Sequence, residues 1–404
     1  MPETVRIPWL HDRHNHTSFF ASLTGCLNLE GLSLQEAIAR IGALPKDQVS
    51  MVFGWHSAKL PFTAEDLRRL PPAIIVNFSL HGFVLSGEAP AMLAASQPEL
   101  VAKRNDKDWC ERNLAYLLET FSHTAHLTAE KLAIHMDRME ALGLAVADDM
   151  LLPGEEALQV IQGSRWGKHI KCWATPRTFK TLGRQAQEAC AGLKFFMDGA
   201  LGSGTAGIDG QFLDGRKGLL LHEDEGLRRI LGEAHGFGKA LAIHAIGDLA
   251  IEQAIRVLEG LHRDGLDFPY VRLEHVQFIR LAQARRAKEL GLTLSLQPNF
   301  NSDSVDYADR LAPEWLEINN PFRMLIDEAG FVPGRDLILG SDGMPHGVEN
   351  ALQWSLFPAF PGQRMTVEEV VAGYGADPGR SGWSLLEIDR EARRVKLLES
   401  KAEA

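Results

Sequence analysis

Eight short apolar runs that alternate with helical stretches constrain the fold of this chain more than any other feature of its sequence. The runs lie at residues 7–10, 144–148, 169–173, 193–197, 240–244, 271–275, 292–296 and 337–342. Continuously apolar strands are typical of a parallel sheet whose two faces are covered by crossover helices. Eight strands is also the number that closes a (β/α)8 barrel, so the pattern predicts an α/β protein with a TIM-type barrel.

An open, doubly wound sheet is the alternative arrangement of the same elements. Its main sign, a G-x-G-x-x-G turn after the first run, is absent from the sequence. The glycine-rich loop at residues 199–207 has no lysine of a phosphate-binding loop, and it is either a flexible turn or a loop at the mouth of a site. The dinucleotide-binding alternative therefore has little support.

The stretch between the first and second runs has a mixed α/β character of its own. Ser33 with Glu36, and Thr63 with Asp66, are spaced as capping boxes that begin two helices. We therefore expect one domain with two additions: a barrel over residues 1–404, an insertion over its mouth at 17–126, and a C-terminal appendage at 383–404.

Composition excludes several classes of partner. The formal net charge of −11 argues against a general nucleic-acid or anionic-membrane binder, which needs a basic surface. No stretch reaches the roughly 18 uninterrupted apolar residues of a membrane span, and the N-terminus does not read as a secretion signal. We expect a cytoplasmic protein that acts on a small molecule and binds neither nucleic acid nor membrane.

Chemically active side chains occupy the carboxyl ends of the runs, which is where a barrel carries its catalytic residues. His14 and His16 follow the first run, and they would project to one face of an extended strand. The fifth run ends in His244, the sixth in His275 and the eighth in Asp342. Imidazole and carboxylate groups that converge in this way suit a divalent metal such as zinc.

Lys194 stands inside the otherwise apolar fourth run, with Asp198 shortly after it on the same face. A buried lysine without a partner is costly, so its presence indicates a purpose. A salt bridge to Asp198 beside a single metal is the structural explanation.

The order and context of these motifs resemble the amidohydrolase superfamily, and within it the amidohydrolase-3 (YtcJ-like) group of metal-dependent hydrolases. The motifs that carry the resemblance lie at residues 12–16, 194–199, 244–248, 274–275 and 340–342. Many members flank the barrel with a small β-sandwich built from the two ends of the chain. Here we expect that sandwich to be largely absent, because residues 384–389 and 394–398 suffice only for a hairpin.

The resemblance implies a set of metal ligands at the top of the barrel. His14, His16 and Asp342 would hold one ion, His244 and His275 a second, and Lys194, carboxylated by CO2, would bridge them. A carbamate would turn a costly buried cation into an anionic ligand.

The same ligands imply a hydrolase in which a metal-bound hydroxide attacks a non-peptide C–N bond of an amide, cyclic amide or urea-like group. Asp342 is the expected general base, and His81 the expected donor to the developing oxyanion. Trp55, His81, Asp198 and Gln297 are the expected substrate-binding residues.

Two alternatives to this hydrolase stay open. A one-metal deaminase of a cyclic nitrogen compound would leave Lys194 uncarboxylated. A catalytically silent, metal-binding regulatory barrel would keep the ligands without the activity. The sequence also leaves a homo-oligomer open.

Overall fold

The computed structural model describes residues 2–56, 59–77, 80, 82–377 and 379–403. The chain divides into two compact units: Met1–Thr17 with Ala133–Ala404, and Ser18–Leu132. Each unit is described by itself. The unit bounds are close to the insertion expected at residues 17–126, whose position over the barrel mouth stays a prediction.

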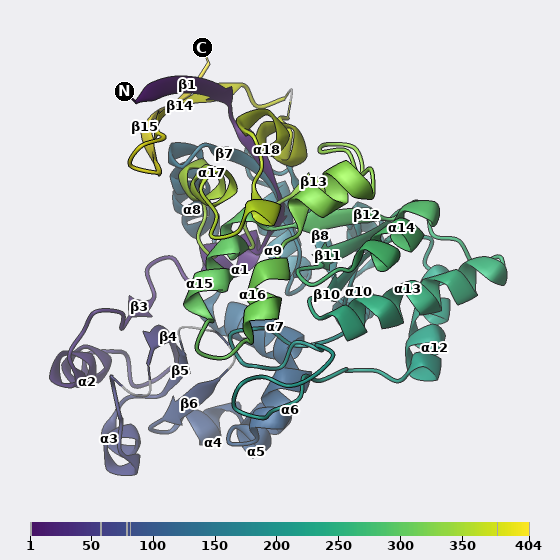
Figure 1. The fold of residues 1–404 in the computed structure, drawn as a ribbon. Helices are drawn as coiled ribbons and strands as arrows, with labels where there is room; N and C mark the ends of the chain where they lie inside the picture. Colours follow the sequence, from purple (N-terminus) through teal and green to yellow (C-terminus); the bar gives the residue numbers. More distant parts are fainter. Residues whose placement is uncertain (1, 57–58, 78–79, 81, 378, 404) are drawn as a thin grey trace. The chain divides into compact units, whose positions relative to one another are not determined.

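An eight-stranded parallel sheet lies at the centre of the first unit (Figure 1). Its order is β13-β12-β11-β10-β9-β8-β7-β2, and β13 also lies against β2. Beyond the end of β13, the Asp342 N–H donates to the His14 carbonyl at 2.7 Å, so the sheet is nearly closed as a barrel. The strands are β2 Leu10–Asn15, β7 Leu144–Asp149, β8 Ile170–Ala174, β9 Gly192–Phe196, β10 Ala240–Ala245, β11 Val271–His275, β12 Thr293–Leu296 and β13 Leu337–Leu339. The predicted barrel is confirmed.

Helices follow the strands of this barrel in turn. The helices are α8 Ala129–Ala141, α9 Glu155–Gln162, α10 Pro176–Thr181, α11 Arg184–Ala189, α12 Asp224–His235, α13 Asp248–Arg263, α14 Leu281–Glu289, α15 Asp303–Asp306, α16 Pro313–Ile318, α17 Val348–Leu356 and α18 Val367–Tyr374, with short 3-10 or π turns at Pro298–Ser302, Met324–Glu328 and Pro361–Gln363. The amphipathic pattern of α13 explains its packing, because Ile251, Ile255 and Leu258 recur on one face and are buried. Among the described residues, no helix combines the length and apolar character that a bilayer span requires.

The structure corrects the placement of the first strand. We expected the first barrel strand to begin with the run at residues 7–10 and to end in His14 and His16, but β2 begins only at Leu10 and ends at Asn15, so His16 lies just beyond β2. The residues before β2 form β1, Glu3–Pro8, which belongs to another sheet. The chain changes sheets at Trp9, whose N–H donates to the Gly382 carbonyl.

A further expectation was also wrong. Asp342 is not the end of a strand, because β13 stops at Leu339 and Asp342 has a φ of 56° in the loop beyond it. Asp248 is the first residue of α13, and Gly247 occupies the cap position. The Asp248 carboxylate accepts a hydrogen bond from the Asp209 N–H at 2.9 Å.

A three-stranded antiparallel sheet joins the two ends of the chain. Its order is β1-β14-β15, and Figure 1 shows these strands beside the N- and C-termini. The predicted C-terminal hairpin is confirmed as β14 Gly382–Asp389 and β15 Arg394–Ala402. Buried side chains alternate along β14, including Leu386 and Ile388, and β15 contacts α17.

The second unit is built around a four-stranded sheet in the order β3-β4-β5-β6. Alternate residues of β5 enter two apolar clusters: Ile74 and Val76 belong to one, Ala73 and Ile75 to the other. Both faces of the sheet are therefore covered. Both predicted capping boxes are present. The elements are β3 Leu27–Asn28, β4 Ser50–Trp55, β5 Ala73–Asn77, β6 Phe83–Ser86, α1 Thr17–Ser22, α2 Leu34–Gly42, α3 Ala64–Arg69, α4 Ala89–Leu93, α5 Pro98–Lys103, α6 Lys107–Arg112 and α7 Leu114–Ala125.

Candidate metal centre

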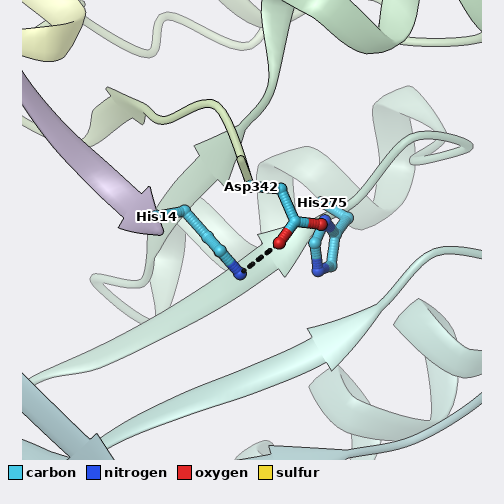
Figure 2. A group of neighbouring side chains, drawn as sticks. All are labelled: His14, His275 and Asp342. Carbon is cyan, nitrogen blue, oxygen red and sulfur yellow. Dashed lines mark ion pairs between the residues drawn. The ribbon is translucent and has the colours of Figure 1, made fainter. Parts of the chain in front are cut away.

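Three predicted ligands meet at the carboxyl end of the barrel strands. His14 comes from β2, His275 ends β11, and Asp342 lies in the loop after β13 (Figure 2). Each offers one ligand atom within 4.8 Å of the others. His16 joins this group, because its Nε2 lies 3.0 Å from Asp342 Oδ1.

The imidazole rings form a continuous row across the barrel. The ring centroids of His16 and His14 are 5.6 Å apart, those of His14 and His275 4.7 Å, and those of His275 and His244 4.6 Å. The structure therefore brings together the four histidines that the sequence singled out. Their roles as ligands stay a prediction.

Hydrogen bonds fix the tautomers of His14 and His275. His14 Nδ1 lies 2.5 Å from Glu274 Oε2, and His275 Nδ1 lies 2.7 Å from Gln297 Oε1. Carboxylate and amide oxygens only accept, so each Nδ1 carries the proton and each Nε2 keeps a free lone pair. His14 Nε2 is buried without a hydrogen-bond partner, which is the state of a ligand atom.

His244 presents its other nitrogen. Its Nε2 lies 3.0 Å from the carbonyl of Gly199 and donates to it, so Nδ1 is the atom left with a lone pair. Gly199 begins the glycine-rich loop, and this contact gives that loop a role in orienting a candidate ligand. Asp198 holds the loops around His244, because its carboxylate accepts hydrogen bonds from the backbone N–H groups of Gly207, Ile246 and Gly247.

The protonation states suit metal binding. Burial, together with the nearby Lys194, lowers the pKa of His14 well below its usual value, and burial and neighbouring imidazoles do the same for His275. Both rings are therefore neutral near pH 7. Burial alone would raise the pKa of Asp342, but the imidazoles of His14 and His16 hold that pKa below its usual value.

Lys194 is the unexplained cation of the site. It is 1% exposed, and its Nζ has no hydrogen-bond partner. Burial lowers its pKa from 10.5 to about 8, and the nearby charges of Glu274 and Asp342 limit that drop. The described ion pairs include none between Lys194 and Asp198, so the salt bridge considered from the sequence does not form. A buried amine that is half neutral near pH 8 is suited to react with CO2.

The predicted substrate-binding residues are distributed unevenly. Gln297 and Asp198 lie at the site, where they hold His275 and the loops around His244. Trp55 lies in the second unit, where its Nε1 donates to the Leu60 carbonyl at 2.9 Å. His81 lies outside the described residues. The substrate roles of all four stay predictions.

Two buried carboxylates have contacts at the site that the sequence did not predict. Glu274 lies in the motif at residues 274–275, and it contacts His14. Burial would raise its pKa, but Arg272 and Lys194 hold the pKa below its usual value. Asp12 accepts hydrogen bonds from the N–H and the hydroxyl of Ser341, and so holds the loop that carries the general-base candidate. For Glu274, the available signal was a charged residue within the apolar run at residues 271–275.

Backbone strain is concentrated at the same place. His275 and Val276 have φ values of 70° and 40°, and Asp342 has 56°. Such values are costly for residues other than glycine and cluster at functional sites. The turn after β11 lets two consecutive residues, Glu274 and His275, serve one site although strand alternation would send them to opposite faces.

A barrel with a row of imidazoles, a carboxylate and a buried lysine at its carboxyl-terminal end defines a class of proteins with a metal centre at that position. The model of the Amidohydrolase family matches residues 6–348, and the chain belongs to this family.

Curated relatives match a part of the chain. YtcJ of Bacillus subtilis (strain 168), which carries an amidohydrolase name, is 32% identical over 139 residues, covering 34% of this chain and 26% of YtcJ. Protein LONG AFTER FAR-RED 3 of Arabidopsis thaliana is 32% identical over 118 residues, covering 28% and 20%. The matched stretch thus spans about a quarter or less of each relative's length.

Solved structures share the fold over most of the chain. An uncharacterized metal-dependent hydrolase from Pyrococcus horikoshii OT3 superposes with a TM-score of 0.69 at 22% identity, covering 92% of this chain and 80% of that one. An uncharacterized metal-dependent hydrolase from Pyrococcus furiosus superposes with a TM-score of 0.69 at 21% identity, covering 92% of this chain and 81% of that one.

Proposed function

We propose that this protein is a metal-dependent hydrolase that cleaves a non-peptide C–N bond in an amide, cyclic amide or urea-like small molecule. The observation that carries the proposal is the convergence of free imidazole nitrogens on an ionised Asp342, with the buried Nζ of Lys194 beside them. Family membership supports the same reaction type.

The donor set fits one or two divalent ions. We assign His14, His16, His244, His275 and Asp342 as ligands. Lys194, converted to a carbamate, would complete the set as a bridge and would remove the cost of its buried charge. A bound divalent ion lowers the pKa of water and polarises a carbonyl oxygen, and zinc suits these ligands.

The chain's own groups then handle the proton. Asp342 is ionised near neutral pH, so it is able to take the proton of the attacking water and return it to the leaving nitrogen. Its hydrogen bond from His16 and the brace that Asp12 provides through Ser341 fix its direction. Gln297 holds the ring of His275 through the same step.

The one-metal deaminase is the second candidate, and one observation favours it. The compact group of His14, His275 and Asp342 supplies three ligands, which is enough for one catalytic ion. Lys194 would then remain an amine.

Elemental analysis of the purified protein tests the proposal. We expect about two equivalents of a transition metal per chain, and a sharp fall in this metal content in a His14→Ala/His16→Ala double variant. The intact mass of the chain should include CO2 bound to Lys194. About one equivalent without CO2 favours the deaminase. No binding after reconstitution with Zn²⁺ refutes both candidates.

Substrate panels then separate the reactions. Hydrolysis of N-acyl amides, cyclic amides and substituted ureas by the metal-loaded protein supports the proposal, and ammonia release from amino-heterocycles supports the deaminase. A fully loaded protein that turns over neither panel points to a silent regulatory barrel.

A further inference from the structure

A chain of buried polar and charged side chains fills the barrel interior next to the candidate metal centre. Its members are His11, Asp148, Arg272, Glu274 and His14, and each is at most 4% exposed. Barrel interiors are ordinarily packed with branched apolar side chains. This layer is therefore a departure that requires an explanation.

Consecutive contacts connect the chain from one end to the other. Glu274 Oε2 lies 2.5 Å from His14 Nδ1, and Arg272 Nη2 donates to the same oxygen at 3.1 Å. Arg272 Nη1 donates to Asp148 Oδ2 at 2.9 Å, and the other oxygen of Asp148 lies 2.8 Å from His11 Nε2.

Arg272 also anchors the chain to the barrel wall. Its Nη2 donates to the Arg13 carbonyl at 2.6 Å and to Ser295 Oγ at 2.9 Å. One guanidinium therefore joins β2, β7, β11 and β12. Only a planar group with several fixed donors makes all of these contacts at once, and a lysine would not replace it.

Stability does not account for such an arrangement. Desolvation of buried ions offsets most of their mutual attraction, and replacement of such groups by apolar side chains of similar volume is often neutral or stabilising. The hydrogen bond to a metal ligand suggests another role, because a carboxylate on the far nitrogen fixes the ring and raises its basicity.

We propose that Glu274 is a positioning residue for the metal ligand His14, and that Arg272 and Asp148 lock Glu274 in place through a buried relay of charges. The proposal rests on the proposed function in one respect, namely that His14 binds a metal. Glu274 itself would not touch the metal or the substrate.

The first test compares metal binding in two matched substitutions in the full-length protein. Glu274→Gln keeps the shape of the side chain, and Arg272 retains its pairing with Asp148. Glu259→Gln makes the same change in a carboxylate that pairs with Arg286 on the outer helices. Zn²⁺ affinity is measured by competition with a chelator, and the Co²⁺-substituted proteins give ligand-field spectra.

We expect Glu274→Gln to weaken Zn²⁺ binding about 10- to 100-fold and to alter the Co²⁺ spectrum. Glu259→Gln should leave both unchanged. Glu274→Ala should bind metal more weakly than Glu274→Gln, because glutamine still accepts a hydrogen bond from His14. Wild-type affinity and spectrum in Glu274→Gln would overturn the proposal, whereas a wild-type protein that binds no metal would instead refute the proposed function.

A second measurement needs no folded variant at position 274. Ring ¹⁵N chemical shifts of the metal-free wild-type protein, assigned with a His14→Gln variant, report which nitrogen carries the proton. The proposal requires the proton on Nδ1 of His14. A proton on Nε2 would overturn it.

Discussion

Lys194 gives the sharpest prediction about stability. Its amine is buried without a hydrogen-bond partner, and its pKa falls from 10.5 to about 8. At ~1.4 kcal/mol per pKa unit, this difference means that the charged amine costs the folded protein about 3 kcal/mol. In a buffer that contains a chelator and no CO2, Lys194→Met should therefore raise the free energy of unfolding by about 3 kcal/mol at pH 7.

The pH dependence follows from the direction of the shift. Below about pH 8 the amine is protonated in the folded and unfolded states, so the full cost applies. Between about pH 8 and 10.5 the folded state releases the proton first, and the wild-type protein gains stability relative to the variant. Above that range the charge cost disappears.

Urea denaturation followed by circular dichroism at pH 7 and pH 10.5 measures both effects. Lys180→Met is the matched control, because that side chain is 54% exposed and its loss should change stability by less than about 0.5 kcal/mol. A metal-free Lys194→Met protein that is no more stable than wild type at pH 7 would refute the reasoning. With metal and CO2 the order should reverse, since only wild type gains the binding energy.

Four further substitutions, one of them a control, test other parts of the structure. Gly340→Ala would place its Cβ 2.2 Å from the His14 backbone nitrogen, so we expect the free energy of unfolding to fall by about 1–3 kcal/mol and Zn²⁺ binding to weaken. In the control Gly232→Ala the new Cβ meets nothing within 4 Å, and the free energy of unfolding should rise by up to about 1 kcal/mol. Equal melting temperatures of the two variants would contradict this. Ser33→Ala removes a capping hydrogen bond of α2 and should cost about 1 kcal/mol without changing metal content, which thermal melts and elemental analysis check together. Asp342→Asn should lower kcat by about 10²- to 10⁴-fold with a smaller change in KM; unchanged kcat on a cleaved amide would remove Asp342 as the base.

Local signals in the sequence predicted most of the barrel. Strands buried on both faces need continuous apolar runs, and capping boxes such as Ser33 with Glu36 mark helix starts without reference to the rest of the chain. The histidines of the candidate site were visible for a related reason. A polar residue at the end of an apolar strand has few structural explanations, so His14, His244 and His275 stood out.

Long-range pairing was not predictable in the same way. The change of sheet at Trp9 depends on the pairing of β1 with β14, and these two strands are separated in sequence by nearly the whole chain. The contact between His14 and Glu274 joins residues 260 positions apart. The left-handed backbone of His275 and Asp342 is equally invisible, because Asp and His adopt it more often than most residue types but still rarely, and here the surrounding fold imposes it.

The junction between the first and last barrel strands has a consequence for how this protein would come apart. Among the described residues no strand ladder joins β2 to β13; they meet through the carboxylate of Asp12 on Ser341 and the N–H of Asp342 on His14. An ion held by His14 and Asp342 would connect the two strands across this junction. Metal dissociation and separation of the strands would then share one activation barrier. Any change that raises the rate of zinc loss should therefore also raise the rate of proteolysis in the 340–347 loop.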